Sequence, residues 1–376
     1  MVAPFDGRFM RRALDLARQG WGQTSPNPMV GAVLVRDGQI VGEGSHRGFG
    51  ADHAEVAAIR AAGPDTRQAT LYVTLEPCAH SGQTPPCTRA ILESGIARVV
   101  VAARDPNPAA GCGVDDLREA GLQVDTGLCQ DEALRLNAAF FWSYLGTGPF
   151  VALKLALSLD GAIAAYAGQR TEITGPEAQD EVHRLRAGFD SVLVGSGTAD
   201  VDDPLLTVRG QITPRIPPVR IVLDSDLSLS PEGRLAASAQ EAPVWLIAGR
   251  SEDRDQLRDK RSETLRSRGV SLLESHRGPD GELDLGLMLE LIGTEEVKSV
   301  LCEGGAKVAD ALLAAGLVHR LYLFLSPILL GRSGVRVFGD GGPGDKWISS
   351  EPISFGADTL LQLESEDFMT LLRGAT

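Results

Sequence analysis

Short apolar runs alternate with amphipathic stretches along the first half of the chain, and they predict strands separated by helices. Residues 29–35 are apolar and rich in strand-forming residues, Asp37-Gly38 is typical of a hairpin turn, and residues 39–43 can form the returning strand. Further strands are expected at 70–75, 98–103 and 122–126, and helices at 53–62, from Cys87, at 114–120 and at 130–144. This alternation indicates an α/β fold.

The tetrapeptide Gly146-Thr147-Gly148-Pro149 interrupts the pattern near the middle of the chain, just before a new strand at 150–157. We therefore expect two domains, 1–146 and 147–376. The second domain again alternates, which predicts a mixed or mostly parallel sheet. Its expected elements are a helix at 176–187, strands at 191–194, 219–223, 244–248 and 299–302, and a final strand at 320–325. Residues 250–281 are charged and weakly patterned, and predict surface helix and loop.

Length, charge and cysteine content narrow the class of protein. The chain of 376 residues can hold two cores, and its 36 basic and 50 acidic residues give a net charge of −14. Such a surface repels nucleic acid, so a small molecule is the expected partner. The sequence lacks a secretory signal, an apolar run of ~18 residues and a disulfide framework. We expect a cytoplasmic protein that binds neither nucleic acid nor membranes.

The strongest chemical signal in the first half is a set of metal-ligating residues. His53-Ala54-Glu55 stands at an expected helix start, and Cys78 and Cys87 each follow a proline. One imidazole and two thiolates leave one position of a tetrahedral zinc ion open, which is typical of a catalytic site. Zinc lowers the pKa of a water molecule at that position, and Glu55 can carry its proton to a leaving amine. The pattern predicts a zinc-dependent deaminase of a small amino-substituted heterocycle.

Other interpretations of these residues stay open at this point. Eight residues separate the two cysteines, whereas the common base-deaminase pattern has two. The histidine and the cysteines could be ordinary surface and core residues, or His80 or His46 could complete a structural zinc site. A deaminase of a base in RNA and a non-enzymatic zinc module are the alternative functions. The acidic composition argues against the first of these.

A larger set of motifs resembles the bifunctional riboflavin-biosynthesis deaminase/reductase family over nearly the whole chain. The first half carries Thr24-Ser25-Pro26-Asn27-Pro28, Gly42-Glu43-Gly44-Ser45-His46, His53-Ala54-Glu55, Thr74-Leu75-Glu76-Pro77-Cys78, Thr84-Pro85-Pro86-Cys87 and Asp105-Pro106-Asn107-Pro108. The second half carries Lys154, Ser158-Leu159-Asp160-Gly161, Arg186, the stretch from Asp202 to Arg209, and Glu303-Gly304-Gly305.

This resemblance implies two consecutive reactions on one pathway intermediate. A cytidine-deaminase-like three-layer domain would use Zn²⁺ to deaminate a diaminopyrimidinone ribosylamine 5′-phosphate. A dihydrofolate-reductase-like domain would then use NADPH to reduce the ribosyl group to a ribityl chain. The resemblance also suggests a homo-oligomer.

The resemblance further implies roles for individual residues. In the deaminase half Asn27 and His46 would contact the substrate, while Gln83 stands where a basic residue is expected. In the reductase half Lys154 and Glu303 would be catalytic, and the substrate contacts would be Arg186, Leu206, Arg209 and Glu303. Cofactor contacts would come from Ala156, Thr198, Asp202, Ser225, Gly304, Gly305, Ala306 and Lys307.

Two features of the second half depart from known patterns. A Gly-x-Gly-x-x-Gly fingerprint after a strand is absent from the sequence, so a Rossmann domain is not expected. Arg170 and Glu172 replace the serine and tryptophan usual in the family, which weakens any prediction of contacts from that stretch. Cys112, Cys129 and Cys302 have no motif around them and are expected to be core thiols.

Overall fold

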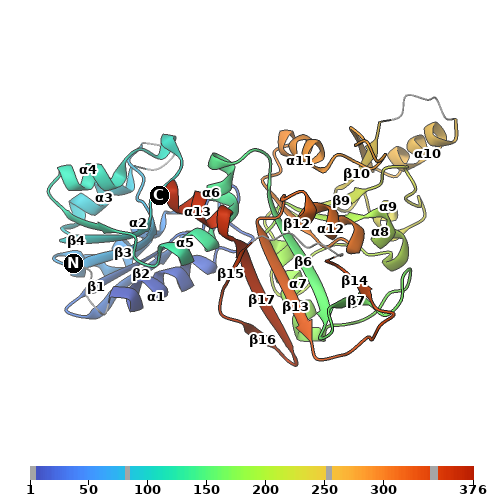
Figure 1. Cartoon of the computed structure of the whole chain (residues 1–376). Helices are drawn as coiled ribbons and strands as arrows, with labels where there is room; N and C mark the ends of the chain where they lie inside the picture. Colours follow the sequence, from blue (N-terminus) through green and yellow to red (C-terminus); the bar gives the residue numbers. More distant parts are fainter. Residues whose placement is uncertain (1–5, 81–84, 251–255, 339–345) are drawn as a thin grey trace. The chain divides into compact units, whose positions relative to one another are not determined.

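The computed structural model describes residues 6–80, 85–250, 256–338 and 346–376. Within it the chain forms two compact units, one of Met1–Gly146 with Met369–Thr376 and one of Thr147–Phe368 (Figure 1). The last eight residues thus pack with the first unit, not with the second domain to which the sequence boundary would assign them. Arg373 fixes them there, because its guanidinium donates two hydrogen bonds to Asp131, at 2.8 and 2.7 Å.

The first unit is built on a five-stranded sheet in the order β2-β1-β3-β4-β5. Strand β1 pairs antiparallel with β2 and β3, whereas β3, β4 and β5 are parallel. The strands are β1 (Gly31–Arg36), β2 (Gln39–Ser45), β3 (Thr70–Leu75), β4 (Arg98–Ala103) and β5 (Gln123–Thr126). The helices are α1 (Asp6–Arg18), α2 (Ala54–Ala62), α3 (Cys87–Ser94), α4 (Gly113–Glu119), α5 (Gln130–Leu136) and α6 (Ala138–Leu145), with short 3-10 turns at Gly63–Thr66 and Pro108–Ala110.

Helices cover both faces of this sheet. Successive side chains of a strand point to opposite faces, and in the buried strands the apolar side chains on both faces need a covering layer. Leu71 and Val73 of β3 pack in one core with Ala58 of α2 and Ile91 of α3. Tyr72, between them, points to the other face, where its ring lies 5.4 Å from that of Phe9 in α1. The result is the expected three-layer arrangement.

The prediction of one continuous helix at 130–144 is wrong, because two helices, α5 and α6, meet at Asn137. The Asn137 side chain accepts a hydrogen bond from the backbone N–H of Met29 at 2.8 Å and donates one to its carbonyl at 2.9 Å. Asn137 is buried and has a non-helical backbone. Its amide therefore satisfies the backbone of Met29, which precedes β1, at the cost of helix continuity.

The second unit is built on a ten-stranded sheet in the order β11-β10-β9-β8-β12-β6-β13-β17-β15, with β16 also on β17. Neighbouring strands from β11 to β13 are parallel, and β17 is antiparallel to β13. The strands are β6 (Phe150–Ser158), β8 (Ser191–Gly195), β9 (Val219–Leu223), β10 (Val244–Gly249), β11 (Ser271–Ser275), β12 (Ser299–Cys302), β13 (Arg320–Ser326), β15 (Trp347–Ser349), β16 (Ile353–Phe355) and β17 (Asp358–Ser365). A small separate sheet pairs β7 (Ala162–Ala164) with β14 (Val335–Arg336).

The helices of this unit are α7 (Pro176–Ala187), α8 (Ser196–Asp202), α9 (Arg234–Ala237), α10 (Gln256–Ser267), α11 (Leu285–Thr294) and α12 (Ala306–Ala314). Helix α13 (Glu366–Gly374) follows β17, and its residues from Met369 belong to the first unit. The mixed, mostly parallel sheet agrees with the sequence pattern. The expectation that 320–325 is the final strand is wrong, because β17 adds an antiparallel strand beside it. Residues 250–281 also contain a strand, β11, in addition to helix α10. In the described residues, no helix is both long and apolar enough to cross a membrane.

Candidate active sites

The three metal ligands predicted from the sequence lie together in the first unit, near the N-termini of helices α2 and α3. His53 precedes α2, Cys78 follows β3, and Cys87 is the first residue of α3. The Nδ1 atom of His53 lies 3.1 Å from the Cys87 sulfur and 3.6 Å from the Cys78 sulfur. All three ligand atoms lie within 4.8 Å of one another, and in the described residues they are the only such group of three or more.

This donor set fits a zinc ion. Ligands at about 2.0 to 2.3 Å from one tetrahedral ion lie roughly 3.3 to 3.8 Å apart. The separation of 3.6 Å between His53 and Cys78 falls in this range, and that of 3.1 Å between His53 and Cys87 is slightly shorter. The hydrogen bond from the Cys87 thiol lowers the pKa of Cys78 to about 4 against the effect of burial, and His53 adds to this shift. A lowered pKa favours the thiolate form of Cys78, which is the form that binds zinc. Neither His46 nor His80 belongs to the group, so among the described residues no fourth protein ligand completes it.

Glu55 lies in the first turn of α2 beside these ligands. Its side chain is buried, and burial raises the pKa of Glu55 to about 7. A carboxyl group with such a pKa can accept and return a proton near neutral pH, as general acid–base chemistry requires. The position and the environment of Glu55 both fit the predicted role.

Asn27 and His46 also lie at this site. The Asn27 amide nitrogen lies 3.4 Å from Nε2 of His46, whose Nδ1 lies 3.2 Å from the carbonyl of Asp52. The His46 ring meets that of His53 edge to face, with centroids 5.9 Å apart. Burial lowers the pKa of His46, so its neutral form is favoured. Gln83 lies outside the described residues.

Sequence reasoning missed one residue that builds this site, Glu76. Its buried carboxylate accepts hydrogen bonds from the N–H of Asp105 at 3.2 Å and of Val114 at 2.8 Å. These bonds tie the turn that carries Cys78 to the end of β4 and the start of α4. A glutamate followed by Pro-Cys at the end of a buried strand was the available signal.

The second unit brings Lys154, Arg186 and Glu303 together from β6, α7 and the end of β12. Arg186 donates two hydrogen bonds to the Glu303 carboxylate, at 2.5 Å from Nε and 2.9 Å from Nη2. Its Nη1 donates to the carbonyl of Thr207 at 3.1 Å. The Lys154 nitrogen lies 3.9 Å from Glu303, and all three charged side chains are largely buried.

These contacts set the ionisation of the group. Burial opposes the charge on Glu303, but the charge and hydrogen bonds of Arg186, with Lys154, lower the pKa of Glu303 to about 2. Burial lowers the pKa of Lys154, and the Glu303 charge opposes that shift. At neutral pH Glu303 is thus a carboxylate that cannot donate a proton, whereas an ammonium group on Lys154 can.

The segment from Asp202 to Arg209 runs beside this group. Leu206 is buried and has a positive φ of 53°, which turns the chain so that the Thr207 carbonyl meets Arg186. Arg209 is exposed, and its backbone N–H donates to Nδ1 of His183 at 3.2 Å. His183 was missed from the sequence, although it lies three residues before Arg186 on α7 and so shares its face.

The remaining predicted residues lie along the carboxyl ends of the parallel strands. Gly305 directly precedes α12 and lies against α8. A Cβ atom on Gly305 would lie 3.1 Å from the hydroxyl of Thr198 in α8. Such a glycine turn at a helix start presents backbone N–H groups to an anion. Ala156 is on β6, Asp202 ends α8, Ser225 follows β9, and Gly304, Ala306 and Lys307 flank the turn.

Two departures from the family pattern, Arg170 and Glu172, lie on the surface. Arg170 and Glu172 are exposed and form an ion pair with a nitrogen–oxygen distance of 3.6 Å. The expectation of three core thiols is wrong for two of them, because Cys112 is exposed and Cys129 is half-buried. Both precede helices, at α4 and α5, where the chain turns at the surface. Cys302 is buried, as expected.

Comparison with known proteins agrees with both sites. Residues 4–103 match the cytidine and deoxycytidylate deaminase zinc-binding region, and residues 149–361 match the RibD C-terminal domain. The riboflavin biosynthesis protein RibD of Aquifex aeolicus is 41% identical over 88% of this chain and 89% of that protein. That of Escherichia coli is also 41% identical, over 87% and 89%.

Solved structures are also similar to this chain along most of its length. RibD of Acinetobacter baumannii, form 1, has a TM-score of 0.77 at 35% identity and covers 96% of this chain and 98% of its own. A diaminohydroxyphosphoribosylaminopyrimidine deaminase/5-amino-6-(5-phosphoribosylamino)uracil reductase of Thermotoga maritima has a TM-score of 0.76 at 35% identity, with the same coverage. The expected combination of a cytidine-deaminase-like domain and a dihydrofolate-reductase-like domain is confirmed. With matching domains in both halves and relatives that align along most of its length, the chain belongs to the RibD family of riboflavin biosynthesis proteins.

Proposed function

We propose that this chain carries out two consecutive steps of riboflavin biosynthesis, a zinc-dependent deamination and an NADPH-dependent reduction. The first unit would release ammonia from a diaminopyrimidinone ribosylamine 5′-phosphate. The second would reduce the ribosyl group of the product to a ribityl chain. The observation that carries the proposal is the presence of both built sites in one chain: His53, Cys78 and Cys87 beside buried Glu55, and Lys154 beside Glu303.

In the deamination, zinc held by His53, Cys78 and Cys87 would supply an activated water molecule. Glu55 would take a proton from that water and deliver it to the leaving amine, which its pKa near neutrality suits. Neutral His46 and the Asn27 amide would hold the pyrimidine ring by hydrogen bonds.

In the reduction, NADPH would supply the hydride to the sugar carbon. Lys154 would donate a proton to the ring oxygen as the sugar opens, because Glu303 is ionised and cannot do so. Glu303 would hold the Lys154 ammonium in place and favour its charged form. This assigns proton donation to Lys154 and a positioning role to Glu303, whereas the family resemblance implied a catalytic role for both residues.

The substrate phosphate would bind chiefly to Arg209. All three guanidinium nitrogens of Arg186 already donate to acceptors within the protein, whereas Arg209 is exposed. Arg186 would then act through Glu303. Leu206 would set the path of the segment that presents Arg209.

The cofactor would lie along the carboxyl ends of the parallel strands, where ligands of open α/β sheets bind. Gly304, Gly305 and Ala306 offer backbone N–H groups at the start of α12 for a phosphate. Thr198 and Asp202 of α8, Ser225 after β9, Lys307 of α12 and Ala156 of β6 would complete the contacts.

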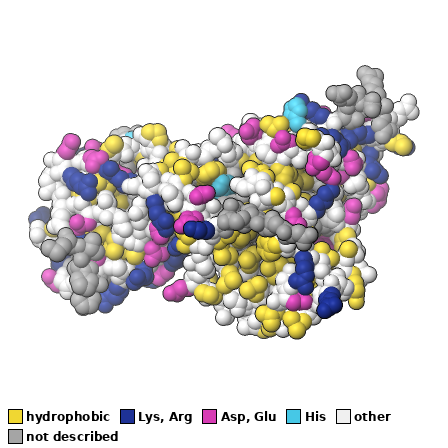
Figure 2. Space-filling view, in the orientation of Figure 1, with side chains coloured by type: hydrophobic (Ala, Val, Ile, Leu, Met, Phe, Trp, Pro, Cys, Tyr) yellow, Lys and Arg dark blue, Asp and Glu magenta, His cyan; other side chains and the backbone are white. Residues whose placement is uncertain are grey.

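We also propose a homo-oligomer that works in the cytoplasm. A broad apolar area covers part of the second unit over β6, β13 and β17 (Figure 2). Strand register places Leu323, Leu325, Leu361 and Leu363 on one face of the sheet, and all four are only partly buried. A second copy offers the same apolar surface, as a two-fold dimer requires.

One coupled assay tests the two activities. The purified chain is given the phosphorylated diaminopyrimidinone intermediate with NADPH, and ammonia release and NADPH oxidation are followed together. Ammonia should appear first, and NADPH should be oxidised only after deamination. Ammonia release from a tRNA and not from this nucleotide would overturn the proposal.

A further inference from the structure

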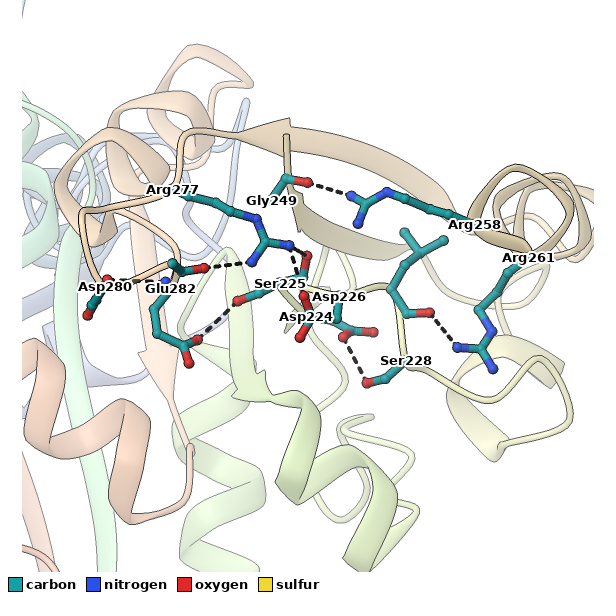
Figure 3. Close-up of polar contacts among 12 residues, drawn as sticks. Asp224, Ser225, Asp226, Ser228, Gly249, Arg258, Arg261, Arg277, Asp280 and Glu282 are labelled. Carbon is teal, nitrogen blue, oxygen red and sulfur yellow. Dashed lines mark hydrogen bonds and ion pairs between the residues drawn. The ribbon is translucent and has the colours of Figure 1, made fainter. Parts of the chain in front are cut away.

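Glu282 lies in the hairpin between β11 and α11. Arg277 and Leu283 pair across this hairpin, and the N–H of Gly278 donates to the Glu282 carbonyl at 2.7 Å. The Asp280 side chain accepts from the N–H of Glu282 at 3.1 Å (Figure 3). Backbone and side-chain bonds therefore define where the Glu282 side chain starts.

The Glu282 carboxylate bridges Ser225 and Lys307, two residues for which the family resemblance implies cofactor contacts. One oxygen accepts from the Ser225 hydroxyl at 3.2 Å, and the other lies 2.6 Å from the Lys307 ammonium nitrogen (Figure 3 shows the Ser225 contact). Ser225 follows β9, and Lys307 is in the first turn of α12 after β12. Strand β8 pairs with both β9 and β12, and all three strands are parallel. The carboxyl ends of β9 and β12 therefore lie at the same edge of the sheet.

A hydroxyl and an ammonium group that converge on one negatively charged group define an anion position. Lys307 and Glu282 are substantially exposed, at 79% and 49% of their side-chain surface, so their ion pair is weak. A phosphate group carries more charge than a carboxylate and accepts the same hydrogen bonds. It can therefore displace Glu282 from Ser225 and Lys307.

The guanidinium of Arg277 fixes the surrounding backbone. It donates to the carbonyls of Ser225 and Gly281 and to the carboxylate of Asp226, the last at 2.9 Å (Figure 3). Since Arg277 joins the turn after β9 to the hairpin that carries Glu282, the distance between Ser225 and Glu282 is held by the fold. The Ser225–Glu282 contact follows from this arrangement.

We propose that Glu282 occupies the position of a phosphate group of the nicotinamide cofactor and limits the affinity of the second unit for that phosphate. The inference rests on the proposed cofactor site and adds a residue that competes with the cofactor for it. Removing the negative charge breaks the ion pair with Lys307 and removes repulsion of the phosphate, so phosphate binding becomes tighter.

Isothermal titration calorimetry of the full chain with NADPH, 2′,5′-ADP and ADP tests this proposal. Glu282→Gln should bind NADPH about threefold to tenfold more tightly than the parent chain, and the gain should shrink as salt is raised. Glu274→Gln, which removes one exposed charge from neighbouring β11, is the matched control and should change affinity less than about twofold. A gain for 2′,5′-ADP alone identifies the 2′-phosphate, and a gain for ADP alone identifies the pyrophosphate.

Two failures are distinguishable. A parent chain that binds none of the three nucleotides overturns the proposed cofactor site itself. A parent chain that binds NADPH, with Glu282→Gln equal or weaker in affinity, overturns only the role of Glu282. Weaker binding would show that the carboxylate accepts hydrogen bonds from the cofactor instead of competing with it.

Discussion

Arg186 and Glu303 form a two-point ion pair, with nitrogen–oxygen distances of 2.5 and 2.9 Å, between helix α7 and the end of strand β12. The two side chains are 11% and 8% exposed. A buried pair of this geometry keeps Glu303 ionised, and the resulting charge faces Lys154. The reductase chemistry proposed above depends on this arrangement, because it leaves Lys154 as the group that can donate a proton.

The Arg186–Glu303 pair predicts the effect of removing one partner. Arg186→Gln should destabilise the second unit by about 3 to 5 kcal/mol, since it leaves a buried carboxylate without its main partner. NADPH oxidation should fall at least ~100-fold, while ammonia release by the first unit is unchanged. Arg186→Lys keeps the charge but not the fork of donors, and should recover part of the stability and less of the activity. Urea unfolding and the two separate assays measure these effects. An equal loss of ammonia release and NADPH oxidation in Arg186→Gln would contradict the placement of Arg186 in the reductase site.

The same pair predicts how stability depends on pH. The pKa of Glu303 is lowered to about 2 in the folded chain, so its contribution is fully present above its unfolded pKa near 4.5. It is lost as the pH falls through the folded value. Between about pH 5 and pH 2 the free energy of unfolding should drop by on the order of 3 kcal/mol through this group. Urea unfolding of the parent and of Glu303→Gln over this pH range measures it, and parallel curves for the two would refute the prediction.

Glu55 is expected to move protons without holding the metal. Glu55→Gln should reduce ammonia release by about 10² to 10⁴-fold. It should leave zinc content near one per chain and NADPH oxidation of the deaminated substrate intact. Glu93→Gln, an exposed carboxylate on α3 paired with Arg89, is the control and should have full activity. The prediction fails if Glu55→Gln purifies without zinc or retains ammonia release.

Metal removal should separate the two activities. A strong chelator should abolish ammonia release but spare NADPH oxidation, since the ligand group lies wholly in the first unit. Added Zn²⁺ should restore ammonia release in the parent chain and not in Cys87→Ser, because the vacancy in the ligand set persists. Elemental analysis before and after treatment counts the metal. Deamination that survives with less than a tenth of an ion per chain would remove the basis of the proposed mechanism.

Local sequence was enough to predict the secondary structure that carries most site residues. The alternation of apolar residues gave β3, β9 and β12 with their observed bounds and helix α7 with its observed bounds. Hydrophobic period and turn residues act within a few positions of one another, so one sequence suffices to interpret them. The ligand types and the proline before each cysteine likewise indicated the metal site from residues 53–87.

Long-range pairing set the features that sequence reasoning missed. Glu303 meets Arg186 across 117 positions, and Asn137 meets the backbone of Met29 across 108. Nothing in the neighbouring residues specifies either partner, so the helix at 130–144 was expected to be continuous and the ion pair between Arg186 and Glu303 was not expected. By itself the sequence determined which chemical groups were available and on which elements they stand. Only the tertiary structure decided which of them meet, and therefore which carboxyl group is ionised and which ammonium can give up its proton, because burial and close opposite charges arise only when distant segments pack together.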